Sequence, residues 1–283
     1  MARTILHIGA HKTATTYMQK KLALNVEALD ARGIHYDPLE IFRKNFTNSL
    51  QDPAKGNAEY REALKEKIRT QDVILSEENI PGVPGDLVRG GNYYLNAHER
   101  VKLVCRLLDL EKPEIFMALR EYSGFIVSMY CEYIRHQKFL PFADYFEIYR
   151  KSGFRWPQTI AEISAAVPQS EIKLWDFTRF RTQEPRIFDA LLGQDASFLH
   201  APEGPVRESF SETAIQVIGT LSGMIRHHEL KQLINPIARA LPKGDDHKAF
   251  NPLAADIVEE LKALYAEDLK TIAAMPRVTF IGE

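Results

Sequence analysis

Cysteine is scarce in this chain, and its scarcity limits what can hold the fold together. Cys105 and Cys131 are the two cysteines among 283 residues, and each lies within an apolar helical pattern. Two cysteines are too few for a disulfide framework or a four-ligand zinc site. We therefore expect two reduced core thiols, and nothing in the sequence calls for a metal.

Long apolar runs, internal repeats, low-complexity tracts and an excess of one charge are also missing. No run approaches the roughly 18 apolar residues of a membrane helix. A strand-like pattern begins within three residues of the start, which leaves no room for a signal peptide. We therefore expect a cytoplasmic protein with no transmembrane segment. The formal net charge of −2 argues against a general nucleic-acid binder.

What is present is the composition of a soluble globular protein, with 45% hydrophobic and 26% charged residues. Without a long linker, we expect a single domain over residues 1–283, with a helical part from about 205 to 283. Strand patterns alternate with helical ones, which predicts an α/β fold: a parallel sheet with helices on both faces and ligands at the carboxyl ends of the strands. The strands are expected at residues 4–8, 72–76, 114–119 and 171–175, and the main helices at about 15–29, 58–69, 96–110, 123–137, 159–167, 211–233 and 252–273.

The most informative segment is TILHIGAHKTATTYMQ, residues 4–19, in which a buried-strand pattern leads into a turn rich in lysine and hydroxyl groups and then into a helix. Backbone N–H groups at the start of a helix attract anions. Lys12 adds a full charge, and Thr13, Thr15 and Thr16 add hydroxyl donors. We therefore predict a phosphate cradle at residues 9–16.

The spacing of this cradle distinguishes between kinds of phosphate site. A Walker P-loop, G-x-x-x-x-G-K-[ST], counted from Gly9 would need glycine and lysine where Ala14 and Thr15 stand. The ATPase or kinase pattern is therefore absent. The pattern G-x-x-K-T-x-T-T resembles instead the 5′-phosphosulfate loop of sulfotransferases that use 3′-phosphoadenosine 5′-phosphosulfate (PAPS). Those enzymes usually have glycine at the place of Ala14, where alanine fits a helical backbone but is strained at positive φ.

A second motif follows the third predicted strand. Arg120 ends that strand, and Ser128 comes eight residues later on the next helix. An arginine at a strand end can make paired hydrogen bonds to phosphate. Taken alone, both residues are common in structural roles. In the sulfotransferases that the cradle resembles, an arginine and a serine with this spacing hold the 3′-phosphate of the nucleotide.

The two motifs together resemble the PAPS-dependent sulfotransferases of the bacterial and carbohydrate type. The resemblance implies transfer of a sulfuryl group from PAPS to an acceptor hydroxyl, in a sugar, a lipid or a small molecule, with PAP (adenosine 3′,5′-bisphosphate) as product. It implies a catalytic role for Lys12 at the leaving oxygen. Tyr17 either stacks on adenine or begins the core face of its helix. The implied nucleotide-binding residues are Gly9, His11, Lys12, Thr13, Ala14, Thr15, Thr16, Tyr17, Arg120 and Ser128.

Transfer to a hydroxyl also needs a base. The segment Ser76-Glu77-Glu78-Asn79 follows the second predicted strand, where the resemblance places a base glutamate, and the alignment favours Glu78 with Glu77 as the second choice. The small-molecule members of the family use histidine, which makes His98 a third candidate.

Two further segments resemble the family more weakly, and two other functions are alternatives. Lys243-Gly244 partly resembles a basic loop that closes over the 3′-phosphate, and the segment from Arg207 to Ser211 resembles an Asn-x-Ser segment. The alternatives are a P-loop kinase or NTPase with a degenerate loop, and a non-catalytic nucleotide-binding protein, which Ala14 supports. The sequence does not choose the acceptor or the oligomeric state.

Overall fold

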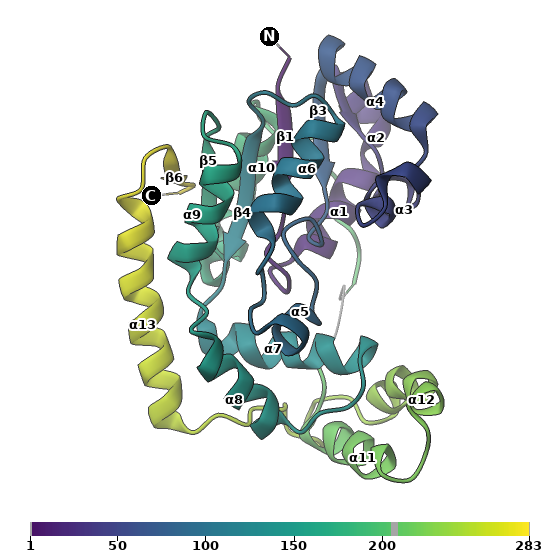
Figure 1. Ribbon diagram of the computed structural model, residues 1–283, viewed down its shortest axis with the longest axis vertical. Helices are drawn as coiled ribbons and strands as arrows, with labels where there is room; N and C mark the ends of the chain where they lie inside the picture. The colour runs from purple at the N-terminus through teal and green to yellow at the C-terminus, as the bar shows by residue number, and fades with distance from the viewer. Residues whose placement is uncertain (1, 205–208, 283) are drawn as a thin grey trace.

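The structure is a single parallel sheet with helices packed on both faces (Figure 1). The computed structural model describes residues 2–204 and 209–282, so Arg207 lies outside the described residues. All strand pairings are parallel, and the order is β2-β3-β1-β4-β5-β6. The predicted α/β fold is confirmed. The strands are β1 (Thr4–His7), β2 (Ile34–Tyr36), β3 (Asp72–Ser76), β4 (Glu114–Leu119), β5 (Ile172–Asp176) and β6 (Val278–Phe280).

Two of these strands were not predicted, and both lie at an edge of the sheet. β2 and β6 have three residues each, which is too short for an apolar period to stand out. β6 pairs with β5, so the C-terminal part, expected to be helical, also supplies a strand.

The predicted helices over 58–69, 96–110, 123–137, 159–167 and 252–273 are found close to their expected bounds, those over 15–29 and 211–233 differ, and a helix over 180–192 was not among the main helices expected. The helix expected over 15–29 is interrupted at Asn25, whose side-chain amide donates to the carbonyls of Lys21 and His200. The helix expected over 211–233 is split around Gly223, and its second half continues to residue 240. The helices are α1 (Thr15–Leu24), α2 (Val26–Asp30), α3 (Leu39–Asn45), α4 (Ala58–Thr70), α5 (Asp86–Gly90), α6 (Ala97–Leu107), α7 (Tyr122–His136), α8 (Phe142–Ser152), α9 (Trp156–Ala166), α10 (Phe180–Leu192), α11 (Glu212–Ser222), α12 (His227–Ala240) and α13 (Ala255–Ala273).

Alternating side chains of the strands build two cores, one on each face of the sheet. Leu6 of β1 packs into the larger core with Val101 of α6 and Ile160 of α9. Ile5, its neighbour in the sequence, packs into the other core with residues of α1 and α10, among them Leu22. Burial of these apolar surfaces is the main term that holds the layers together. Among the helices of the described ranges, none combines the length and apolarity that a membrane crossing requires.

The topology fixes where a ligand can bind. β1 and β4 are neighbours at the centre of the sheet, but the chain leaves β1 toward β2 and leaves β4 toward β5. Loops that diverge in this way open a crevice at the carboxyl ends of the strands. α7 runs across that end of the sheet (Figure 1).

Candidate functional site

The cradle is a tightly held loop between β1 and α1. After β1 ends, the backbone stays paired with β4, because Ala118 N donates to Gly9 O (2.7 Å) and Ala10 N donates to Ala118 O (3.2 Å). The Thr13 hydroxyl donates to Ala10 O at 2.5 Å. The backbone N–H groups of the cradle are therefore fixed in position before any ligand arrives.

Two residues of the cradle have a left-handed backbone. Lys12 has φ 63° and Ala14 has φ 64°, and α1 begins only at Thr15. Backbone that alternates in hand turns successive N–H groups toward one concavity, which is an anion-binding nest. The helical conformation that would suit alanine is thus not found at residue 14, and a left-handed L-residue costs about 1–2 kcal/mol.

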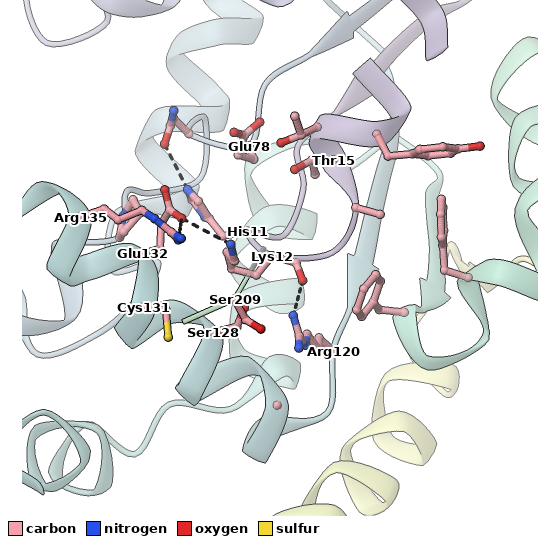
Figure 2. A pocket seen from close by; sticks show the side chains of 18 of the residues that line it. His11, Lys12, Thr15, Glu78, Arg120, Ser128, Cys131, Glu132, Arg135 and Ser209 are labelled. Carbon is pink, nitrogen blue, oxygen red and sulfur yellow. Dashed lines mark hydrogen bonds and ion pairs between the residues drawn. The ribbon is translucent and has the colours of Figure 1, made fainter. Parts of the chain in front are cut away.

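A pocket of about 1360 Å³ opens over the cradle at the carboxyl ends of the strands (Figure 2). Thr13 and Gly9 are not among its lining residues, and the Thr13 side chain is fully buried. The prediction that the Thr13 hydroxyl faces the anion is therefore wrong, because that hydroxyl closes the loop. The predicted site residues that do line the pocket are His11, Lys12, Ala14, Thr15, Thr16, Tyr17, Glu78, Arg120 and Ser128.

Arg120 joins the two predicted motifs. Its Nη1 donates to the backbone carbonyl of Lys12 at 2.5 Å, and its guanidinium lies 5.0 Å from the centre of the Phe177 ring. Burial lowers the pKa of Arg120, so its charge is poorly solvated, and an anion in the pocket would compensate for that loss.

One end of the pocket is aromatic. Tyr17, Phe177 and Phe180 line it, with the Tyr17 and Phe180 rings edge to face at 5.9 Å. The Tyr17 hydroxyl donates to Glu184 at 2.7 Å, and burial together with Glu184 raises the pKa of Tyr17 to about 12. The two phenylalanines were not predicted, although the segment DFTRF at the end of β5 was a visible signal.

The two adjacent glutamates after β3 have different surroundings. Glu77 is 1% exposed and forms a bidentate ion pair with Arg43 of α3, at 2.5 and 2.7 Å. Glu78 lines the pocket, where its two carboxylate oxygens accept hydrogen bonds from Gln19 and Arg43, both at 2.9 Å. Burial raises the pKa of Glu78, but His11, Arg43 and Gln19 outweigh burial and hold it below its usual value.

The two histidines considered for this region lie in different places. His11 is buried in the pocket wall, with Nε2 3.1 Å from Asn79 Oδ1 and Nδ1 3.1 Å from the Tyr94 hydroxyl. His98 is outside this pocket; it contacts the carbonyl of Glu162 on α9 and lines a separate shallow groove. His98, the third candidate base, is therefore not in position to act at the cradle.

A charged group that was not predicted faces Lys12 from α7. Glu132 is buried, with one oxygen 3.4 Å from Lys12 Nζ and the other 3.0 Å from His136 Nε2. Arg135 lies 3.6 Å from the same carboxylate. Glu132 comes four residues after Ser128 on the same helix, and this spacing places the two side chains on one face. The spacing does not show whether that face is turned toward the cradle.

Comparison with known proteins adds little to this geometry. No protein-family model matches the chain, and no curated protein sequence matches it. Among solved structures, a sulfotransferase from Alicyclobacillus acidocaldarius is similar, with 15% identity and a TM-score of 0.40 over 83% of this chain and 97% of that one. At this level the similarity assigns neither an activity nor a site residue.

Proposed function

We propose that this chain is a sulfotransferase that moves a sulfuryl group from PAPS to an acceptor hydroxyl and releases PAP. The observation that carries the proposal is the contact between the two anion motifs. Arg120 donates to the carbonyl of Lys12, and Ser128 lines the same pocket, so the two motifs proposed to bind phosphate share one cavity. A nucleotide with phosphates on both sides of its ribose needs such a pair of sites.

The residues present fit the parts of this donor. Lys12, Thr15, Thr16 and the nest would hold the 5′-phosphosulfate, and Arg120 with Ser128 would hold the 3′-phosphate. The aromatic end of the pocket offers a slot for adenine, since bases stack on aromatic rings. Lys12 would stabilise the charge that develops on the leaving phosphate oxygen.

The acceptor must lose a proton as the new bond forms. Glu78, the base predicted from the sequence, and Glu132 both line the pocket next to the cradle: Glu78 packs on Gly9, and Glu132 contacts Lys12. Either carboxylate is a candidate for a part in that proton transfer.

Ligand-dependent melting tests the donor assignment directly. PAP should raise the melting temperature well above the shift produced by AMP or by ATP with magnesium, because only PAP carries both phosphates. Equal shifts of the melting temperature with PAP and AMP would exclude the two-phosphate site. A larger shift with ATP and magnesium would favour a kinase or NTPase. Transfer from labelled PAPS should then be measured over a panel of sugars, phenols and alcohols, with Lys12→Ala as the inactive, folded control.

One observation favours a non-catalytic relative of such enzymes. The left-handed φ of 64° at Ala14 calls for glycine, and alanine there shows that the chain tolerates strain at the cradle. PAP binding without transfer to any acceptor in the panel would support that alternative.

A further inference from the structure

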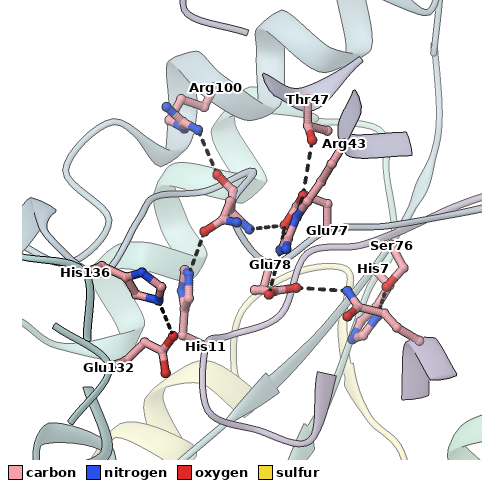
Figure 3. Close-up of polar contacts among 12 residues, drawn as sticks. His7, His11, Arg43, Thr47, Ser76, Glu77, Glu78, Arg100, Glu132 and His136 are labelled. Atoms are coloured by element: carbon pink, nitrogen blue, oxygen red, sulfur yellow. Dashed lines mark hydrogen bonds and ion pairs between the residues drawn. The ribbon is translucent and has the colours of Figure 1, made fainter. Parts of the chain in front are cut away.

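Glu132 and His136 form a carboxylate–imidazole pair in the pocket. They lie four residues apart on the last turns of α7, and therefore on one face of the helix. Figure 3 shows the contact between His136 and Glu132. His136 Nε2 is 3.0 Å from Glu132 Oε1, and Glu132 Oε2 is 3.4 Å from Lys12 Nζ. Since Lys12 is the cation proposed to face the leaving oxygen, the pair adjoins the place of sulfuryl transfer.

The two members of the pair differ in exposure. The Glu132 side chain is 7% exposed, whereas that of His136 is 50% exposed. An ionised carboxylate can only accept hydrogen bonds, so it selects the neutral tautomer in which Nε2 carries the proton. The lone pair is then on Nδ1. A buried carboxylate that orients a more accessible imidazole is the arrangement of a general base and its positioning residue.

Glu78 is less suited to the same task. Both of its oxygens already accept hydrogen bonds, from Gln19 and Arg43. Its pKa is held below the usual value, and a weaker base takes a hydroxyl proton less readily. The contacts of Glu78 instead connect the cradle helix α1 to α3.

Resting on the proposed function, we propose that His136 is the base that accepts the acceptor proton and that Glu132 is its positioning residue. The acceptor oxygen forms a bond to sulfur while the bond from sulfur to the 5′-phosphate oxygen breaks, and the electron pair of that bond stays on PAP. The hydroxyl proton moves to Nδ1 of His136. The resulting imidazolium is stabilised by Glu132 and by the carboxyl end of α7, and its exposure lets the proton pass to solvent.

The pair lies in a pocket that is lined by charges of both signs. The described residues with charged or titratable side chains that line the same pocket include Lys12 and His11 of the cradle, Arg135 and Cys131 of α7, Arg43, Glu78 and Lys243, and Lys12 and Arg135 lie next to Glu132.

The test compares His136→Gln and Glu78→Gln with wild type, using His98→Gln as a control that removes a histidine outside the pocket. His136→Gln should lower kcat/KM for phenol by about 10²-fold or more, while the PAP-induced melting shift stays as in the control. In wild type, protonation of the base should make kcat/KM decline at low pH, and this decline should be absent in His136→Gln. The acceptor p-nitrophenol is ionised at mildly alkaline pH and needs no base. With this acceptor, kcat/KM of His136→Gln should therefore be close to that of wild type.

Several outcomes would overturn the inference. Wild-type kcat/KM and pH profile in His136→Gln would exclude His136 as the base, and equal losses with phenol and p-nitrophenol would show a structural role. A loss of kcat/KM in Glu78→Gln but not in His136→Gln would identify Glu78 as the base. These failures differ from failure of the proposed function, in which wild type itself transfers to no acceptor or does not distinguish PAP from AMP.

Discussion

Replacing Arg120 with methionine should separate the affinities for PAP and AMP. Methionine keeps an unbranched side chain against Phe177 and removes the charge that is proposed to hold the 3′-phosphate. A hydrogen bond to a charged group contributes about 1.5–3 kcal/mol, which corresponds to about a 10- to 150-fold loss of PAP affinity. AMP has no 3′-phosphate and should lose little from this source.

The variant also removes the hydrogen bond from Arg120 to the Lys12 carbonyl, and that loss affects both ligands. Because its donor is a charged guanidinium, this hydrogen bond contributes about 1.5–3 kcal/mol to the order of the cradle, and any part of it that appears as lost affinity is the same for PAP and AMP. The ratio of the two affinities cancels this shared part. We therefore expect the PAP to AMP ratio to fall by about 10- to 150-fold.

Isothermal titration calorimetry of both ligands with wild type and variant measures this ratio. Arg181 supplies the matched control, because it is an exposed arginine that lines the same pocket. Arg181→Met removes the same charge and should weaken both ligands by a similar factor. If Arg120→Met lowers the affinities for PAP and AMP equally, the reasoning that places the 3′-phosphate at Arg120 is refuted.

Three further predictions concern stability. Ala14→Gly should raise the free energy of unfolding by about 0.5–1 kcal/mol, because relief of left-handed strain exceeds the entropy that glycine adds to the unfolded chain; a lower value in urea unfolding would contradict the strain. Arg43→Met should lower the free energy of unfolding by about 3–5 kcal/mol, because the Glu77 carboxylate would stay buried without its ion pair. Calorimetry should show this as a melting temperature roughly 10 °C lower. Adding Glu77→Gln to this variant should recover part of the lost stability. Burial lowers the pKa of His7 from 6.5 to about 4, so the unfolded chain binds the proton more readily than the folded chain. The free energy of unfolding therefore falls as the pH drops below about 6.5, and this fall levels off below about pH 4. Urea unfolding should show about 2 kcal/mol less stability at pH 5 than at pH 7 from this residue, and His7→Gln should remove that part; an unchanged slope in the variant would show that His7 is not its source.

Local patterns in the sequence determined the sheet class and the kinds of residue at the pocket. The four longer strands have four to six residues each, most of them buried, and burial on both faces leaves segments rich in apolar residues that can be read directly. The cradle and Arg120 each follow such a strand. Since parallel strands end at one edge, their presence in one pocket was predictable.

Only the tertiary structure decided which functional groups face that pocket. Thr13 and Thr15 look equivalent in the sequence, but the Thr13 hydroxyl closes the loop on Ala10, while Thr15 lines the cavity. Glu77 and Glu78 are adjacent, and α3 selects between them because Arg43 makes its bidentate ion pair with Glu77.

The left-handed backbone at Ala14 and the approach of Glu132 to Lys12 have the same kind of origin. Alanine gives no sign of a positive φ at its own position, and the approach of Glu132 depends on how α7 packs against the cradle. Residue types and spacings are local properties, and the sequence by itself determined them for this protein. The direction of a side chain, its exposure and its ion-pair partners follow from long-range packing, which only the folded chain decides.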